Sequence, residues 1–380
     1  MKNIFILVII STVLSYHFII PIDYFNKEKI ETDSLASVKI SFVGDLMCHS
    51  PQIEFAKISE DSFDFNPTFS EVKKYLTESD LTIGNLETTI SGKESKYSGY
   101  PLFNSPDEYL EALKNTGFDL LFTSNNHSLD RGKKGVLRTL AKIKDYGMNS
   151  TGSFLSQQDR DSIRVFDVNG IRIAFLAYTY GLNGNYLSKN EKYLVNVSDS
   201  VLIKNDIANA RQKNSDVIIV YFHFGNEYQR YPSEFQKEIA KRSVEYGANI
   251  IIGSHPHVIQ PVEYINSNKN KIGKSLVVYS LGNFISNQRW RYSDAGVILN
   301  LTITKNKSSQ SISLSKTDFI PTWVFKGQIA NRNEFVILPA DSLSFLSLPE
   351  YLSDSEKAQL IQAGKDAYKM VDSTKNKLNK

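Results

Sequence analysis

Residues 249–260 read Asn-Ile-Ile-Ile-Gly-Ser-His-Pro-His-Val-Ile-Gln, a short apolar run that ends in two histidines separated by one proline. The apolar run predicts a buried strand. Alternate residues of an extended segment point to the same side, so we expect the imidazoles of His255 and His257 to face one point. Pro256 fixes φ between them and offers no backbone donor, which stiffens the pair. Two ordinary turn histidines after a core strand are an equally good interpretation of this motif by itself.

Length, charge and cysteine content limit the class of protein. The chain has 380 residues, 44 basic against 41 acidic side chains, a net charge of +3 and 41% hydrophobic residues. This length fits two domains or one large domain with a sizeable core. Without a basic excess or stripe, we expect no nucleic-acid partner. The single cysteine, Cys48, excludes an intrachain disulfide and a thiolate metal site, and we expect it to be a small buried residue beside a strand end.

The N-terminal part, residues 1–36, predicts a signal or anchor followed by a linker. Residues 4–20 form an apolar run whose length lies between a signal-peptide core and a spanning helix of about 20 residues. No small-x-small cleavage site follows directly, which favours an uncleaved anchor over a cleaved signal. We therefore expect a membrane-anchored or secreted, extracytoplasmic protein, with a main domain over residues 37–330 and a C-terminal extension with a helix over residues 331–380.

Predicted strands alternate with predicted helices through the main domain. The strands are expected at 38–43, 81–83, 118–122, 163–168, 171–178, 217–222, 249–253, 275–280, 296–304 and 311–315, and the helices at 69–77, 106–115, 135–146, 201–213, 234–246 and 351–378. Asn169-Gly170 is a strong hairpin signal between two of these strands. The alternation predicts an α/β fold with a largely parallel sheet, joined to an antiparallel part late in the chain.

Chemically active side chains follow the predicted strands. Ligands in open α/β sheets bind outside the carboxyl ends of the strands, so residues placed there converge. The residues in this position are Asp45, Glu87, Asn126, His127, His223, His255 and His257. By itself, Asp45 is better explained as a helix N-cap. As a set, imidazole and carboxylate ligands suit Zn, Mn, Fe or Ni better than Ca or Mg, so the sequence predicts a transition-metal site.

Six motifs in a fixed order resemble a known family. They are Gly-Asp at 44–45, Gly-Asn-x-Glu at 84–87, Asn-Asn-His at 125–127, His-x-Gly-x-Glu-Tyr at 223–228, Gly-x-His-Pro-His at 253–257 and Ser-Leu-Gly-Asn-Phe at 280–284. Over residues 38–303 this order is similar to the CapA family, the capsule and poly-γ-glutamate biosynthesis proteins of the calcineurin-like metallophosphoesterase superfamily. The resemblance implies a four-layer α/β/β/α sandwich with a metal centre at one end.

The resemblance also implies roles for the strand-end residues. It divides six metal ligands into two sets with a shared bridge, namely Asp45 with His257, then Asn126 with His223 and His255, and Glu87 as the bridge. The implied cofactor is one or two divalent transition-metal ions, Mn, Zn or Fe. Asp45 and His127 are the implied catalytic residues. His127 would face away from Asn126 in an extended segment, toward the substrate, as a general acid or charge stabiliser.

Position 47 departs from the phosphoesterase pattern. Phosphoesterases of the superfamily carry Asp-x-His there, whereas this chain has Met47, as CapA-type sequences do, and Glu87 replaces an aspartate bridge. The missing imidazole weakens one metal position, so a single tightly held ion is an open alternative. His49 is a further candidate to take the place of the missing ligand.

Two further groups of side chains are candidates for supporting roles. Asn85, Glu227, Asn283 and Gln260 would hold ligand imidazoles in one tautomer, or would serve only turn chemistry. Arg131, Tyr228, Arg230, Arg289, Trp290 and Arg291 would contact substrate, or would form a solvated rim. Guanidinium groups suit the carboxylates of a polyanion because they bind them in bidentate fashion. Residues 179–198 are expected to form a lid or rim of the cleft.

The leading functional expectation is a CapA-type protein of capsule or poly-γ-glutamate biosynthesis or export. Its metal-dependent hydrolase site would act on an anionic cell-surface polymer such as poly-γ-glutamate, beside membrane synthase or export subunits. One alternative is an extracytoplasmic metal-dependent phosphoesterase. The other is a non-catalytic polymer-binding or export component, which Met47 keeps open.

Overall fold

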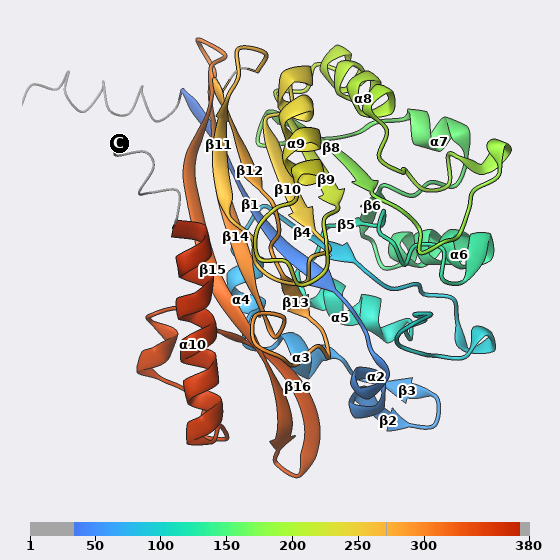
Figure 1. The fold of residues 1–380 in the computed structure, drawn as a ribbon, viewed down its shortest axis with the longest axis vertical. Helices are drawn as coiled ribbons and strands as arrows, with labels where there is room; N and C mark the ends of the chain where they lie inside the picture. Colours follow the sequence, from blue (N-terminus) through green and yellow to red (C-terminus); the bar gives the residue numbers. More distant parts are fainter. Residues whose placement is uncertain (1–33, 271, 373–380) are drawn as a thin grey trace, which may run out of the picture.

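Two β-sheets face each other at the centre of the computed structural model, which describes residues 34–270 and 272–372 (Figure 1). The strands of the first sheet are β1 (Leu35–Leu46), β4 (Leu81–Leu86), β5 (Leu120–Phe122), β6 (Asn149–Thr151), β13 (Asn283–Ile285), β14 (Ala295–Asn306), β15 (Ile312–Ile329) and β16 (Arg332–Pro339). The strands of the second are β7 (Arg164–Val168), β8 (Ile171–Thr179), β9 (Val217–His223), β10 (Ile250–Ser254), β11 (Val262–Asn266) and β12 (Lys274–Val278).

The first sheet has the order β16-β15-β14-β1-β4-β5-β6, with β13 paired to β1. Strands β1, β4, β5 and β6 run parallel, whereas β14, β15 and β16 pair antiparallel. The predicted antiparallel part late in the chain is therefore confirmed. The division expected at residue 330 falls in the turn between β15 and β16, so residues 332–339 lie in the same sheet as the strand before them.

The second sheet has the order β11-β12-β10-β9-β8-β7. Its four central strands are parallel, and β7 and β11 pair antiparallel at the two edges. The predicted hairpin joined by Asn169-Gly170 is the β7–β8 pair. Both sheets therefore point the carboxyl ends of several parallel strands toward a common edge.

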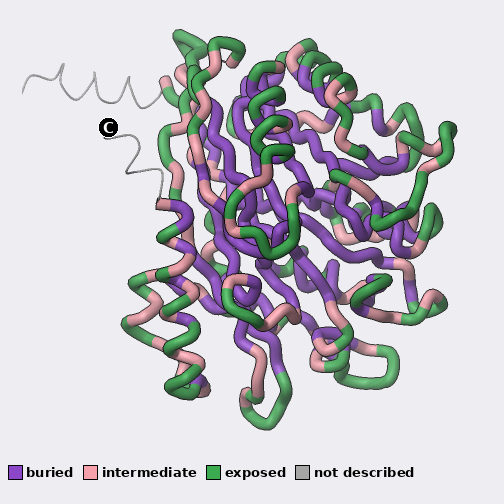
Figure 2. Tube along the Cα trace, in the orientation of Figure 1, coloured by how far each residue is buried: buried purple, intermediate pink, exposed green. Residues whose placement is uncertain are grey.

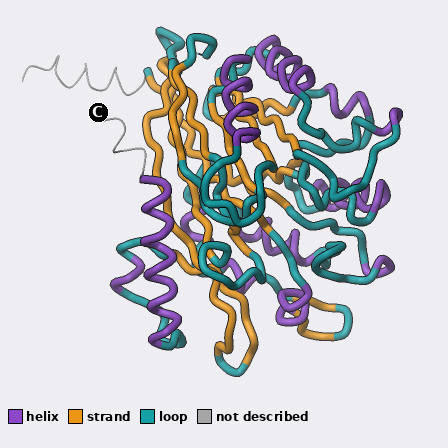
Figure 3. Tube along the Cα trace, viewed as in Figure 1, coloured by secondary structure: helices purple, strands orange, loops and turns teal. Residues whose placement is uncertain are grey.

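Helices cover the outer faces of the two sheets (Figures 1 and 3). Those over the first sheet are α2 (Ser50–Ala56), α3 (Asn66–Phe69), α4 (Lys73–Thr77), α5 (Glu108–Thr116) and α6 (Gly132–Asp145). Those over the second are α8 (Ser200–Gln212) and α9 (Glu234–Tyr246). The remaining helices are α7 (Gln157–Asp161) and α10 (Asp354–Val371), and β2 (Lys57–Ser59) and β3 (Ser62–Phe63) form a separate hairpin. The α/β/β/α layering is therefore as expected.

Side-chain alternation along the strands separates the core between the sheets from the cores under the helices. Val217, Ile219 and Tyr221 of β9 point between the two sheets, whereas Ile218 and Val220 point toward α8 and α9. Successive residues of a strand face opposite sides, and a strand covered on both faces is apolar at every position. Figure 2 shows the buried strands in purple beneath helices that expose one face. None of the helices formed by the described residues has the length and apolar character needed to cross a bilayer.

Several elements differ from the sequence-based expectation. The segment expected at 311–315 is only the start of β15, and the helix expected at 69–77 is divided into α3 and α4. Strands β6, β11 and β16 were not predicted. The three residues of β6 are polar, because this short strand lies at the edge of its sheet, and β11 is half exposed. The expected N-terminal anchor and the end of the helix at 351–378 lie outside the described residues.

Candidate metal centre

Glycines at two strand ends let the backbones approach closely enough to form the site. A Cβ atom on Gly44 would lie 1.9 Å from the carbonyl oxygen of Gly282, and one on Gly253 would lie 2.1 Å from the carbonyl oxygen of Tyr279. Contacts this short mean that any side chain at either position would force the backbone to shift. The glycines that precede Asp45 and the histidine pair therefore place these ligands where neighbouring strands are most tightly joined.

The carboxylates of Asp45 and Glu87 lie together at the carboxyl ends of β1 and β4. Asn85 joins them, because its Nδ2 donates to Asp45 Oδ1 at 2.8 Å and lies 3.3 Å from Glu87 Oε2. His257 approaches from the second sheet, with Nδ1 3.1 Å from Asp45 Oδ2 and Nε2 3.8 Å from Glu87 Oε1. Asp45, Glu87 and His257 thus offer ligand atoms within 4.8 Å of one another.

A second group of ligand atoms shares Glu87 with the first. His223 Nε2 lies 2.9 Å from Asn126 Oδ1 and 3.5 Å from Glu87 Oε1. The rings of His223 and His255 are 4.7 Å apart, and Glu87, His223 and His255 offer ligand atoms within 4.8 Å of one another. The structure therefore brings all six expected ligands together, in two groups that meet at Glu87.

The protonation chemistry of this cluster fits a cation. Burial and the Asp45 carboxylate raise the pKa of Glu87 well above its usual range, whereas burial lowers the pKa of His255 to about 3. Burial opposes ionisation of Asp45, but the hydrogen bond and charge of His257 outweigh it and hold the pKa of Asp45 below its usual range. Glu87 Oε1 and His255 Nδ1 are buried without a hydrogen-bond partner. Buried carboxylates and free imidazole lone pairs at these distances suit a divalent transition metal.

The histidine pair reaches the site by a different backbone path from the one expected. Strand β10 ends at Ser254, and His255 and His257 lie beyond it with φ of 100° and 57°, so the prediction that alternation in an extended segment aims both rings is wrong. The rings nevertheless meet, with centroids 5.8 Å apart. Left-handed backbone at a residue other than glycine is strained, and such strain concentrates at functional sites.

His127 also lies in a turn rather than an extended segment, so the stated reason for its orientation is wrong. Its Nδ1 lies 2.8 Å from Asp130 Oδ2, and its ring packs edge-on against Phe103 at 4.7 Å. Asp130 Oδ2 also accepts a hydrogen bond from the backbone N–H of Phe103 at 2.7 Å. With Nδ1–H donated to Asp130, Nε2 of His127 is the nitrogen left for a substrate.

His49 does not supply the imidazole ligand that Met47 lacks. Met47 is buried, and His49 precedes α2 with Nδ1 3.2 Å from Gln52 Oε1 and its ring against Phe103 at 5.1 Å. Within the described ranges His49 belongs to none of the groups of ligand atoms that could hold a metal. The position formed by Asp45 and His257 therefore has fewer ligands than the one formed by Asn126 and His223.

Three polar groups hold the ligands from behind. Asn283 Oδ1 lies 3.0 Å from His257 Nδ1, and Tyr221 OH lies 3.1 Å from His223 Nδ1. Asn85, described above, lies 3.3 Å from His223 Nδ1. Such partners fix the tautomer of a ligand imidazole. Gln260, in contrast, bonds Gln229 and Gln236 and contacts no ligand, so its expected supporting role is wrong.

Aromatic rings surround the open side of the cluster. Tyr180 packs on His255 at 4.5 Å, Tyr228 lies 6.1 Å from His257, and Trp290 packs edge-on against Tyr228 at 5.1 Å. Tyr100 lies 6.4 Å from His127. These four rings are between 40% and 73% exposed, so they form a rim rather than a core. Glu227 is exposed at the same rim.

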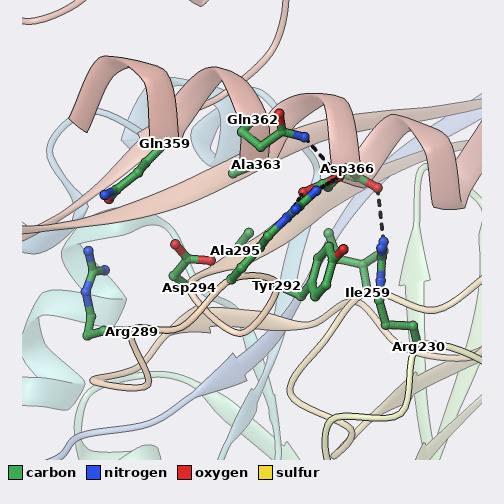
Figure 4. Close-up of a pocket in the computed structure, with 12 residues that line it drawn as sticks. Arg230, Ile259, Arg289, Tyr292, Asp294, Ala295, Gln359, Gln362, Ala363 and Asp366 are labelled. Carbon is green, nitrogen blue, oxygen red and sulfur yellow. Dashed lines mark hydrogen bonds and ion pairs between the residues drawn. The ribbon is translucent and has the colours of Figure 1, made fainter. Parts of the chain in front are cut away.

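The expected substrate arginines lie away from the rim. Arg131 donates to the Ser98 hydroxyl and to the Leu102 carbonyl, so it holds a loop. Arg230, Arg289 and Arg291 line a cavity of about 220 Å³ beneath α10 (Figure 4). Arg291 pairs with the Asp366 carboxylate, Arg230 donates to the Asp366 carbonyl, and Arg289 donates to the Val324 carbonyl.

Asp130, Tyr180 and Tyr221 were not among the expected site residues, although Tyr180 lies in the segment 179–198 that was expected to form a lid or rim. Tyr221 lies two residues before His223 on the same side of β9, and Tyr180 directly follows β8 at a carboxyl end. Asp130 lies three residues after His127, a spacing that closes a turn. The rule that selected the ligands, a position directly after a strand, would have selected Tyr180 but neither Tyr221, which lies inside β9, nor Asp130.

Comparison with known families gives a match over most of the chain. The model of the family described as bacterial capsule synthesis protein PGA_cap matches residues 39–288. The PGA biosynthesis protein CapA of Bacillus subtilis is 29% identical over 281 residues, which are 73% of this chain and 71% of that protein. The capsule biosynthesis protein CapA of Bacillus anthracis is 30% identical over 285 residues, 70% of this chain and 66% of that protein.

Solved structures of similar fold include two hydrolases at low identity. The NAD nucleotidase of Haemophilus influenzae aligns with a TM-score of 0.48 and 14% identity, over 89% of this chain and 64% of that chain. A calcineurin-like phosphoesterase of Bacillus subtilis aligns with a TM-score of 0.45 and 12% identity, over 88% of this chain and 98% of that chain.

Proposed function

Since the chain belongs to the bacterial capsule synthesis protein family PGA_cap, we propose that it is a metal-dependent hydrolase acting on an anionic capsular polymer such as poly-γ-glutamate. The observation that carries the proposal is the buried cluster of two carboxylates and three imidazoles in which Glu87 Oε1 and His255 Nδ1 lack partners. Burying these polar atoms without a partner costs free energy, and a bound metal ion would supply the missing partner.

The chain's own residues divide the work of the site. The ion or ions would be held by the six ligands described above, Asp45, Glu87, Asn126, His223, His255 and His257. A bound ion would polarise a scissile carbonyl oxygen and lower the pKa of a bound water. Asp130 accepts Nδ1–H of His127, so Nε2 is placed to accept a proton from the attacking water and, from the imidazolium so formed, to donate that proton to the leaving nitrogen. The rim rings of Tyr180 and Tyr228 would shield the reacting groups from bulk water.

The rim and the arginine cavity together support a polymer rather than a small substrate. Trp290 lies at the rim against Tyr228, and its sequence neighbours Arg289 and Arg291 line the cavity beneath α10. Arg289 is buried enough that the pKa of its guanidinium is lowered, and Arg230 Nε has no hydrogen-bond partner. When one unit of the polymer lies at the metal centre, another unit of the same polymer would offer its carboxylate to these guanidinium groups.

The proposed place of action is the outside of the cell. The apolar run at residues 4–20 supports a membrane tether ahead of the catalytic domain. A tethered domain would meet the polymer as it leaves the membrane, which suits partnership with synthase or export subunits.

The test is polymer cleavage by the full-length protein. We expect Mn²⁺-loaded wild type to shorten poly-γ-glutamate, as measured by size-exclusion chromatography, and to leave bis(p-nitrophenyl) phosphate largely intact. His255→Ala should lose the activity, and His127→Gln should reduce it about 10²- to 10⁴-fold while still binding metal, because general acid catalysis contributes on that order. Wild type that cleaves neither compound would contradict the proposal, and cleavage of the phosphodiester alone would replace it with a phosphoesterase.

A further inference from the structure

The two metal positions have different numbers of ligands. Four side chains, Glu87, Asn126, His223 and His255, surround one position. The other has three, Asp45, Glu87 and His257, and Met47, two residues after Asp45, offers no imidazole. A catalytic zinc site holds three protein ligands and one water, whereas Mn²⁺ takes six ligands, so the poorer position has room for another donor.

Glu227 lies on the solvent side of the histidine pair, which contributes His255 to one position and His257 to the poorer one. Its carboxylate and the ring nitrogens of His255 and His257 lie within 4.8 Å of one another. His255 is 2% exposed and its Nδ1 has no hydrogen-bond partner. Glu87 approaches the same two histidines from the buried side, so the imidazoles lie between an inner and an outer carboxylate.

The loop that carries Glu227 is fastened to the histidine turn. Tyr228 N donates to the carbonyl of Pro256, the residue between the two histidines, at 2.8 Å. Phe224 N donates to Ser254 O at 3.0 Å, and Gln260 Nε2 donates to Gln229 O at 2.7 Å. Tyr228 has φ of 63°, a strained value for a tyrosine, in the residue directly after the carboxylate. The backbone on both sides of Glu227 is therefore held in register with the histidine pair, although its side chain reaches solvent.

We propose that Glu227 is a further metal ligand, which completes from the solvent side the position held by Asp45, Glu87 and His257. This assignment rests on the proposed function, since it requires that the cluster binds metal. Glu227 takes the place of the missing imidazole at position 47, and its exposure makes it the ligand that an incoming anionic group of the substrate can displace. The donor chemistry at the poorer position is then three carboxylates and one imidazole, which favours Mn²⁺ over a softer ion.

The test is Mn²⁺ binding by the full-length protein, followed by titration calorimetry, for wild type, Glu227→Gln and the control Glu245→Gln. Glu245 is an exposed glutamate on α9 and belongs to none of the ligand groups found among the described residues. We expect Glu227→Gln to weaken one binding event at least about tenfold, as loss of a ligand or of its support does, and to leave the melting temperature of the chelator-treated protein unchanged. The control should match wild type in both measurements.

Two results would overturn the assignment, and they differ in what else they overturn. Metal binding by Glu227→Gln within twofold of wild type contradicts the ligand role alone and leaves the proposed function standing. Absence of Mn²⁺ binding by wild type contradicts both. A second readout is Mn²⁺ electron paramagnetic resonance, where loss of a carboxylate ligand changes the spectrum of the bound ion and loss of a remote charge does not.

Discussion

At the scale of single residues, the site depends on imidazoles that burial keeps neutral. Burial lowers the pKa of His255 to about 3, and burial together with the neighbouring His255 lowers the pKa of His223 well below its usual range. Neutral imidazoles keep a lone pair for a metal at any physiological pH. The same burial makes the metal-free protein sensitive to acid, because an unfolded chain can protonate these rings and the folded one cannot.

We expect the contribution of His255 to the stability of chelator-treated protein to fall as pH decreases from 6.5 toward 3, whereas the raised pKa of Glu87 contributes in the opposite sense. The unfolded chain binds a proton at position 255 near pH 6.5, whereas the folded protein does so only near pH 3, so the contribution of His255 is complete above pH 6.5 and is lost below it. Between pH 6.5 and 5 this loss is on the order of 1–2 kcal/mol. Urea denaturation at several pH values measures it, and the curve of His255→Gln should be flatter. Parallel curves for the two proteins would contradict the account.

At the scale of elements, the sequence predicted where the strands end. It did not predict the backbone conformation of the turns that orient the side chains beyond them. The central strands were predictable because burial on both faces makes them apolar at every position, and β9 and β10 begin and end close to their expected limits. The turns that carry His127 and His255 were not, since alternation describes only extended backbone and both residues lie beyond a strand. The positions of the ligands were thus predictable from strand order, whereas their orientations depended on turn geometry.

Close approach of backbones at the strand ends leads to a prediction about β10. Gly253→Ala would place a Cβ 2.1 Å from the Tyr279 carbonyl and 2.7 Å from the Phe224 ring, so strand β10 must shift. We expect a loss of about 1–3 kcal/mol in the free energy of unfolding, together with weaker metal binding, because His255 moves with the strand.

The matched control is Gly181→Ala, where an added Cβ meets nothing within 4 Å. Its free energy of unfolding should stay within about 0.5 kcal/mol of wild type in denaturant titration. If Gly253→Ala were as stable as this control, the strands would not be joined as tightly as described.

At the scale of the whole molecule, two sheets supply one centre. The first contributes Asp45, Glu87 and Asn126, and the second contributes His223 and the histidine pair, so neither sheet forms the site by itself. Parallel strands of both sheets end at the same edge of the sandwich, which is why residues more than 200 positions apart, such as Asp45 and His257, come within hydrogen-bond distance. The ordered motifs in the sequence correspond to the strand ends that meet at this edge.

The arginine cavity and the aromatic rim differ in how far the sequence predicted them. The arginines were expected to contact substrate directly, but Arg291 and Arg230 bond Asp366 of α10, and the position of this helix depends on packing between segments distant in sequence. The rim rings come from four separate loops, at Tyr100, Tyr180, Tyr228 and Trp290. Residues 179–198, Tyr228 and Trp290 were expected at a rim, and Tyr180, Tyr228 and Trp290 do lie there, whereas the arginine cavity forms only when the sandwich closes.

The most direct test of the central claim is the metal content of the full-length protein purified without chelator, measured by plasma mass spectrometry beside His255→Ala. The two ligand groups that share Glu87 predict up to two transition-metal ions per chain in wild type, with at least one tightly bound, and a clear loss in the variant. Wild type without a transition metal at stoichiometric level, or a variant with the same content as wild type, would contradict the account.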